Sequence, residues 1–218
     1  MTNDEYKNLA AQLRKPSGSE GAEVARFMNE GNERLNRNVI RQIIKKPDLN
    51  VLEVGMGNGK FVFELFDRYS VKNYYGCDYS EDMVKSAKAM NQDSTIAKAA
   101  EFYHCNAKAL PFEGASVDVV FTANTIYFWE DVGEILNEFK RVLKPQGQVI
   151  IGLRPKHLMS QYPFVRYGFN MYETNEIEDA LRKAGYDDIK SMIFDEPNYT
   201  RNDISLPVQS LVVVAQNA

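Results

Sequence analysis

Cysteine is scarce in this sequence, and its scarcity excludes two kinds of architecture. The chain of 218 residues has two cysteines, Cys77 and Cys105, each within an apolar or aromatic run. Two thiols cannot build the disulfide framework of a small secreted domain, and they cannot supply a four-ligand zinc site. We therefore expect two buried thiols and no metal centre.

Long apolar runs and clusters of basic residues are missing as well. No stretch approaches the roughly 20 consecutive apolar residues that a membrane span needs. The formal net charge is -4 and no dense Lys/Arg block occurs, which argues against nucleic acid as a partner. The N-terminus lacks the basic start and apolar block of a secretory signal. We expect a cytoplasmic protein whose partner is a small molecule.

Seven strand-like runs begin at residue 49, and most of them are separated by helical patterns. The runs are LNVLEV, NYYGC, EFYHC, VDVVFT, QVIIGL, DIKSMIF and VQSLVVVAQ. Several are apolar on both faces, as strands of a parallel sheet covered by helices are. The last two lack a crossover helix and should pair antiparallel. The pattern predicts a doubly wound α/β fold: a mostly parallel, seven-stranded, Rossmann-like sheet with an antiparallel C-terminal strand.

The segment before the sheet has a helical pattern of its own. A Pro/Ser/Gly break at residues 16–21 is followed by apolar residues at helical spacing, which predicts one or two amphipathic helices. These apolar positions are Val24, Phe27, Met28, Leu35, Val39, Ile43 and Ile44. We therefore divide the chain into an N-terminal helical segment, residues 1–45, and a main domain, residues 46–218.

A glycine-rich stretch, VGMGNGKF, completes and follows the first strand-like run. In a doubly wound sheet, ligands bind beyond the carboxyl ends of the strands, where a glycine-rich turn lets them approach the backbone. A dinucleotide fingerprint would need a further glycine at the position of Lys60. A phosphate-binding P-loop would need Ser or Thr at the position of Phe61. The spacing therefore disfavours both NAD and ATP.

The remaining pattern, Glu53-x-Gly55-x-Gly57-x-Gly59, resembles that of the class I S-adenosylmethionine-dependent methyltransferases. Four further segments are similar to the same family: YYGCDYSEDMV, FYHCNAKALPF, VDVVFTANTIYFWED and FKRVLKPQGQVII. Among subfamilies, the sequence looks most like the small-molecule methyltransferases related to ubiquinone and menaquinone biosynthesis enzymes. The resemblance implies in-line transfer of a methyl group from S-adenosylmethionine to a small-molecule acceptor, with S-adenosylhomocysteine as product.

Asp78 ends the second strand-like run, where a carboxylate can accept both hydroxyls of a ribose. Ser80 is the more natural cap of the helix that follows. Glu53 lies on an otherwise apolar strand and should organise the glycine loop or meet the ammonium group of the cofactor. At Asn106 the family usually has Asp, which receives the adenine amino group, and Asn can still accept through its amide oxygen. The resemblance assigns to the cofactor Glu53, Gly55, Met56, Gly57, Gly59, Asp78, Tyr79, Met83, Asn106, Ala107, Asn124 and Thr125.

No catalytic base stands out in the sequence. His157 follows the fifth strand-like run, where such enzymes carry acceptor residues. Tyr127 belongs to an aromatic cluster with Phe128 and Trp129, which could stabilise a sulfonium or bound an acceptor pocket. We take His157 and Tyr127 as catalytic candidates, and core packing remains the alternative for each aromatic ring.

The N-terminal segment is expected to form a lid, because elements before the first strand can lie across the cofactor crevice in this fold. Asn29 and Asn32 lie three positions apart, so both could meet a polar ligand from one side of a helix. The alternative is a packing helix with solvated asparagines. The acceptor candidates are Asn29, Asn32, Tyr127, Trp129 and His157.

Two rival functions remain open. One is a non-enzymatic module that binds a nucleotide or S-adenosylmethionine and has lost its acceptor site. The other is an NAD-dependent oxidoreductase, against which Lys60 argues. Turnover with any acceptor would exclude the first, and a binding comparison of the two cofactors would decide the second.

Overall fold

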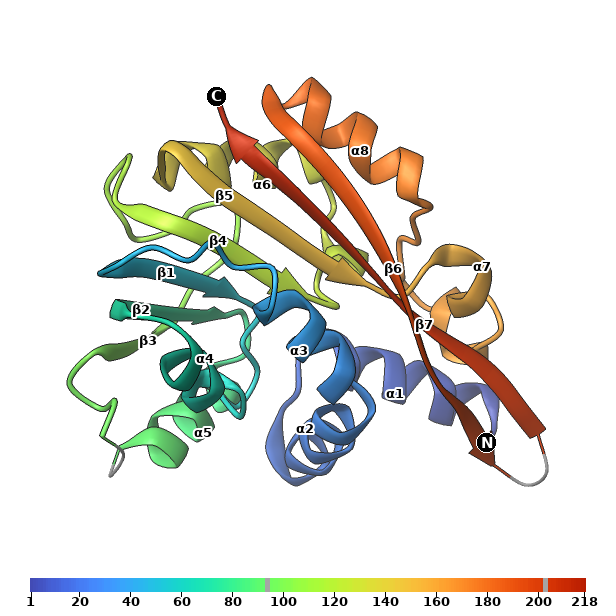
Figure 1. Ribbon diagram of the computed structural model, residues 1–218. Coiled ribbons are helices and arrows are strands. Elements are labelled where there is room, and N and C mark those ends of the chain that lie inside the picture. The colour runs from blue at the N-terminus through green and yellow to red at the C-terminus, as the bar shows by residue number, and fades with distance from the viewer. Residues whose placement is uncertain (93–94, 202–203) are drawn as a thin grey trace.

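The computed structural model describes residues 1–92, 95–201 and 204–218, and it is built around one seven-stranded sheet (Figure 1). The strand order is β3-β2-β1-β4-β5-β7-β6. Strands β1 to β5 are parallel, and β7 pairs antiparallel with both β5 and β6. The strands are β1 (Leu49–Val54), β2 (Val71–Asp78), β3 (Ala100–His104), β4 (Val117–Ala123), β5 (Leu143–Leu153), β6 (Tyr186–Arg201) and β7 (Ile204–Asn217). The predicted fold class is confirmed.

Helices cover both faces of the sheet, because the central strands are apolar on both sides. One face packs against α3 (Glu33–Ile40), α4 (Val62–Arg68) and α5 (Glu81–Asn91). The other packs against α6 (Val132–Val142) and α8 (Thr174–Lys183). The short elements η1 (Ile126–Phe128), α7 (Lys156–Met159) and η2 (Pro163–Arg166) complete that second face.

Side-chain caps fix where two of these helices begin. The Ser80 hydroxyl accepts a hydrogen bond from the Met83 N–H at the start of α5, and the Asp131 carboxylate accepts one from the Glu134 N–H at the start of α6. Such caps satisfy N–H groups that have no partner within the helix. The predicted cap at Ser80 is confirmed, which leaves the Asp78 carboxylate available for other contacts.

Three helices precede the sheet, where the sequence pattern predicts one or two. They are α1 (Asn3–Arg14), α2 (Gly18–Gly31) and α3, and α1 and α2 lie beyond the strand ends (Figure 1). The apolar pattern misses α1 because this helix buries only Ala10, although a capping box from Thr2 to Glu5 marks its start. The expected apolar stripe is wrong at Phe27, whose surface is 60% exposed, since α2 instead buries its small residues.

Strands β6 and β7 are longer than their apolar cores predict. They continue into a twisted hairpin that projects past the rest of the sheet (Figure 1). The register shifts between Glu196 and Tyr199, around Pro197. The polar, proline-containing sequence of the distal part of β6 does not by itself predict a strand, and pairing with β7 supplies the strand structure.

None of the helices among the described residues has the length and apolar character that a membrane span requires.

Candidate functional site

A cavity lies at the carboxyl ends of β1, β2 and β4, and the N-terminal helices form part of its wall. This is the edge at which doubly wound sheets bind their ligands. The predicted site residues that line it are Asn29, Asn32, Glu53, Gly55, Met56, Gly57, Asp78, Tyr79, Met83, Asn106, Ala107, Asn124, Thr125 and Trp129. Gly59, Tyr127 and His157 do not line it.

The glycine loop turns sharply between β1 and α4, and its glycines meet different surroundings. Gly57 has a φ of 59°, and a Cβ atom placed there would meet no atom within 4 Å. At Gly55 a Cβ would lie 2.0 Å from the Cγ2 of Thr125. At Gly59 it would lie 3.1 Å from the Cβ of Ala87, in α5. Gly57 therefore leaves its backbone open to a ligand, while Gly55 and Gly59 allow close packing within the protein.

Asp78 ends β2 with its carboxylate directed at the glycine loop. One oxygen accepts the Gly57 N–H at 2.9 Å, and the other accepts the Ser80 N–H at 2.8 Å. Burial raises the pKa of Asp78 to about 6, although these backbone hydrogen bonds oppose the shift. Since an ionised carboxylate has about four lone-pair positions, both oxygens can still accept hydrogen bonds from a ligand's hydroxyl groups.

Glu53 is a second acid on the same wall, and its residue surface is 6% exposed. The Tyr74 hydroxyl donates to its Oε2 at 2.6 Å. Burial raises the pKa of Glu53 to about 7, with a further contribution from the Asp78 charge. Within the described part of the chain, no lysine or arginine forms an ion pair with either acid. Two uncompensated acids make the cavity suited to a ligand that carries positive charge and hydroxyl groups.

The cavity wall beyond β2 and β3 consists of the aromatic ring of Tyr79, the thioether side chain of Met83 and the polar turn at Asn106. Tyr79 is half exposed, and the Lys15 ammonium lies 4.7 Å from the centre of its ring. Met83 is buried beside it in α5. The Asn106 side-chain oxygen accepts the Lys108 N–H at 3.1 Å, which fixes the turn after β3. This arrangement offers a flat, partly apolar slot with amide groups at its rim.

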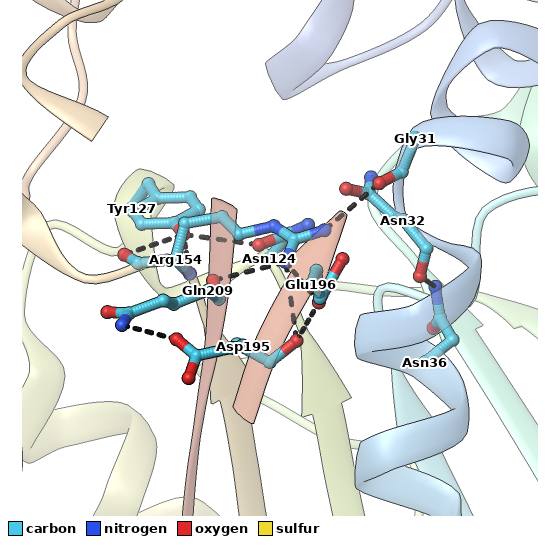
Figure 2. A network of polar contacts seen from close by, with 10 residues as sticks. Gly31, Asn32, Asn36, Asn124, Tyr127, Arg154, Asp195, Glu196 and Gln209 are labelled. Carbon is cyan, nitrogen blue, oxygen red and sulfur yellow. Dashed lines mark hydrogen bonds and ion pairs between the residues drawn. The ribbon is translucent and has the colours of Figure 1, made fainter. Parts of the chain in front are cut away.

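The wall between β4 and the N-terminal helices is lined by amides and aromatic rings, together with the ion pair between Arg14 and Glu130. Asn124 has a φ of 57°, a left-handed conformation that Asn tolerates better than most residues. Asn32 and Asn36 line the same cavity at the start of α3, where the Asn36 side chain donates to the Asn32 carbonyl at 2.9 Å (Figure 2). Phe128 and Trp129 complete this side. A small polar molecule could be held here by hydrogen bonds on one side and rings on the other.

Both catalytic candidates lie outside the cavity lining. The Tyr127 ring is buried, and its hydroxyl accepts the Arg154 N–H at 2.5 Å, so its nearest partners are protein groups. Burial also raises the pKa of Tyr127, which makes it a poor base. His157 is exposed on α7, with its Nδ1 3.3 Å from a carboxylate oxygen of Glu173. The structure does not bring these two side chains to the other site residues.

Several lining residues escaped the sequence analysis. They are Leu13, Arg14, Pro16, Asn36, Cys105 and Lys108, among others. Three of them, Leu13, Arg14 and Pro16, come from α1 and the turn after it, which carry no motif. The turn is fixed by long-range contacts: the Ser80 hydroxyl donates to the Pro16 carbonyl at 2.5 Å, and the Gly18 N–H donates to the Asp82 carboxylate at 2.9 Å. The capping box at the start of α1 is the one local signal that could have revealed this helix.

Comparison with known sequences agrees with this geometry. A family model described as a methyltransferase domain matches residues 52–151. Demethylmenaquinone methyltransferase from Lactococcus lactis subsp. lactis (strain IL1403) is 34% identical over 128 residues, which cover 58% of this chain and 49% of that protein. The chain therefore spans about half the length of this relative.

Solved structures share the fold across most or all of the chain. One is a chain from the complex between the Haloferax volcanii Trm112 methyltransferase activator and a methyltransferase, with a TM-score of 0.76, 20% identity, and coverage of 100% of this chain and 99% of that one. Another is Haemonchus contortus phosphoethanolamine N-methyltransferase 2 with S-adenosylhomocysteine, with a TM-score of 0.72, 16% identity, and coverage of 95% and 60%. At such identities the likeness shows the fold alone. The sequence match assigns residues 52–151 to the methyltransferase domain family, and the glycine loop and the fold are those of a class I S-adenosylmethionine-dependent methyltransferase.

Proposed function

We propose that this chain binds S-adenosylmethionine at the ends of β1, β2 and β4 and transfers its methyl group to a small-molecule acceptor. The observation that carries the proposal is the pair of acids, buried Glu53 and half-buried Asp78, beside the open backbone of Gly57. The cofactor carries a ribose with two hydroxyls, an ammonium group and a positively charged sulfur. Its chemistry therefore matches the charge and the hydrogen-bonding capacity of this wall.

Each part of the cofactor wall has a distinct role in this proposal. Asp78 accepts the ribose hydroxyls while the Gly57 N–H holds its carboxylate in place. Glu53, oriented by the Tyr74 hydroxyl, receives the ammonium group. The adenine lies in the slot between Tyr79 and the turn at Asn106. Binding of a cation should draw both acids into their ionised forms, because it offsets the cost of burying negative charge.

The acceptor lies between β4 and the lid, which is the N-terminal segment 1–45 over the main domain 46–218. Asn29 and Asn32 on the lid orient it by hydrogen bonds, and Trp129 bounds the other side of the acceptor space. When bound, the cofactor supplies a methyl group attached to positively charged sulfur, and the acceptor's nucleophilic atom bonds to that carbon as the carbon–sulfur bond breaks. Orientation and exclusion of water are the protein's main contributions. Glu130, the acidic residue beside Trp129 on this side, is largely exposed and lies 3.5 Å from the Arg14 guanidinium.

Thermal denaturation with added ligands tests the cofactor assignment. S-adenosylmethionine and S-adenosylhomocysteine should each raise the melting temperature, because a ligand that binds only the folded state stabilises it. NAD should leave the melting temperature unchanged. Stabilisation by NAD, with no response to either adenosyl compound, would show that the chain is a nicotinamide-dependent protein.

Transfer of a labelled methyl group tests the reaction and identifies the acceptor class. The full chain would be incubated with S-adenosylmethionine carrying a deuterated methyl group and a small-molecule extract, and the products analysed by mass spectrometry. A molecule that gains the labelled group with the wild-type chain, and not with the Asp78→Ala variant, supports the proposal. Binding of the cofactor without transfer to any component, across extracts from several sources, favours a non-enzymatic binding module.

A further inference from the structure

Arg154, the first residue after β5, joins three parts of the molecule that are far apart in sequence. Its side chain is 11% exposed, and one guanidinium nitrogen donates to the Glu196 carboxylate at 2.5 Å (Figure 2). The same nitrogen donates to the Gln209 carbonyl at 3.1 Å and to the Ser210 hydroxyl at 3.3 Å. Glu196, with a 5% exposed side chain, also accepts the Ser210 hydroxyl. These contacts fix the guanidinium against the β6–β7 hairpin.

The other terminal nitrogen of Arg154 contacts the N-terminal segment. It donates to the Gly31 carbonyl at 3.0 Å, a bond between residues 123 positions apart. Gly31 is the last residue of α2, and Asn32, which follows it, lines the cavity (Figure 2). The last carbonyls of a helix lack partners within the helix, and a cation is favourable at this end of the helix dipole.

The backbone of Arg154 is connected to the opposite wall of the cavity through Tyr127, which does not itself line the cavity. Its N–H donates to the Tyr127 hydroxyl at 2.5 Å, and its carbonyl lies 3.2 Å from that oxygen. The Tyr127 hydroxyl also lies 3.1 Å from the side-chain oxygen of Asn124, which lines the acceptor side. Arg154 therefore contacts both the C-terminal end of α2, through the Gly31 carbonyl, and the Tyr127 hydroxyl, which contacts Asn124 at the end of β4.

We propose that Arg154 is a positioning residue that latches the lid over the cavity, with Glu196 setting the direction of its guanidinium. The opposite end of α2 is held independently, by the bond from the Gly18 N–H to Asp82. Loss of the Arg154 contact should free the C-terminal end of α2 while its start stays attached. Lysine cannot replace the latch, because one ammonium group lacks the planar fork that reaches Glu196 and Gly31 together.

The latch predicts a kinetic effect on any ligand beneath the lid. Leu13, Arg14 and Pro16 line the same cavity as Asp78, so a ligand on Asp78 would lie beside the N-terminal segment. S-adenosylhomocysteine serves as the probe, and to this extent the inference rests on the proposed function. Trp129, the single tryptophan of the chain, lines the cavity and reports binding by its fluorescence.

The test compares Arg154→Lys and Arg154→Met with a matched variant at the other end of β5. Asn217 is buried, and its side-chain nitrogen donates to carbonyls of Leu143 and Lys144, both at 3.1 Å. Asn217→Ala therefore removes a buried side chain that bridges backbone carbonyls far from the lid. Stopped-flow fluorescence measures S-adenosylhomocysteine dissociation, and hydrogen exchange measures the protection of residues 18–31.

Both Arg154 variants should release S-adenosylhomocysteine about tenfold faster and lose exchange protection in the second half of α2, as expected for a lost bond to a charged group. Asn217→Ala should lower the melting temperature while the dissociation rate and α2 exchange stay at wild-type values. Wild-type dissociation and exchange in Arg154→Lys would overturn the latch, and this variant decides the matter if Arg154→Met fails to fold. Absence of any S-adenosylhomocysteine binding by the wild type would refute the proposed function, and exchange of α2 in the unliganded proteins would still test the latch.

Discussion

The two halves of the cavity are built in different ways. The half at the ends of β1 and β2 carries Glu53, Gly57 and Asp78, which come from one short stretch of chain and are joined by bonds such as Gly57 N–H to Asp78. The half between β4 and the N-terminal helices depends on contacts between distant segments, such as the bond from Arg154 to Gly31. Among the described residues, the acids of the first half have no lysine or arginine partner, whereas Arg154, which lies behind the second half, is paired with Glu196.

The two halves therefore have different roles: the first supplies negative charge, and the second covers the cavity. The sheet fixes the acids of the first half, so their unpaired charge is available to a cationic ligand whatever the position of the N-terminal helices. The second half consists of helices held by a small set of polar contacts, which can be broken and remade. Variants in the first half should therefore change cofactor affinity, and variants in the second should change closure and turnover.

Asp78→Ala should give the largest loss of cofactor affinity. We expect binding of S-adenosylhomocysteine to weaken by about 1.5 to 3 kcal/mol, the typical contribution of hydrogen bonds to a charged group, measured by titration calorimetry. Asp131→Ala is the matched control, since Asp131 also accepts a backbone N–H but caps α6 outside the cavity lining. It should lower stability by about 1 kcal/mol and leave affinity unchanged. An unchanged dissociation constant in Asp78→Ala would place the ribose elsewhere.

Removal of the lid should affect turnover more than affinity. Deleting residues 1–30 removes α1 and nearly all of α2, while the glycine loop and Asp78 remain in the sheet. We expect a folded protein that binds S-adenosylhomocysteine about tenfold more weakly and turns over far more slowly, since the acceptor wall is lost. Methylation at the full-length rate would show that the segment is no lid. Failure to fold would assign it to the core.

The raised pKa values of the two acids predict opposite pH trends for binding and for stability. Asp78, with a pKa of about 6, goes from about one quarter ionised near pH 5.5 to almost fully ionised near pH 7.5, so S-adenosylmethionine affinity should rise at least about fourfold over this range. The unliganded protein should instead lose stability with rising pH from about 4 to 7, because its folded state holds protons that the unfolded state has released. Asp78→Asn should flatten both profiles, and affinity that falls with rising pH would contradict this account.

His157→Ala should have the smallest effect. His157 is exposed, its one polar contact among the described residues is to Glu173, and neither residue lines the cavity. We expect kinetic constants within about twofold of wild type, since an exposed pair contributes little. A loss of about a hundredfold or more would show that His157 acts as an acid or base after the lid rearranges.

The sequence was sufficient for the parts of the molecule that depend on local pattern. The carboxyl ends of β1 and β2 and the glycine loop could be predicted because each motif lies within about a dozen residues, and the Ser80 cap could be predicted from the start of its helix. Helix α1 buries too little apolar surface to show a helical pattern. The Arg154–Glu196 pair joins β5 to a hairpin whose polar sequence does not predict a strand, so neither partner carries a signal alone. Tyr127 shares a motif with cavity residues, but the turn of η1 directs it into the core.

A crystal structure of the full chain with S-adenosylhomocysteine tests the division of the cavity most directly. The account predicts both ribose hydroxyls within hydrogen-bonding distance of the Asp78 carboxylate, the ammonium group facing Glu53, and Arg154 bonded to the Gly31 carbonyl above the ligand. A ribose bound away from Asp78, or a ligand seated outside the space between the glycine loop and the N-terminal helices, would contradict it.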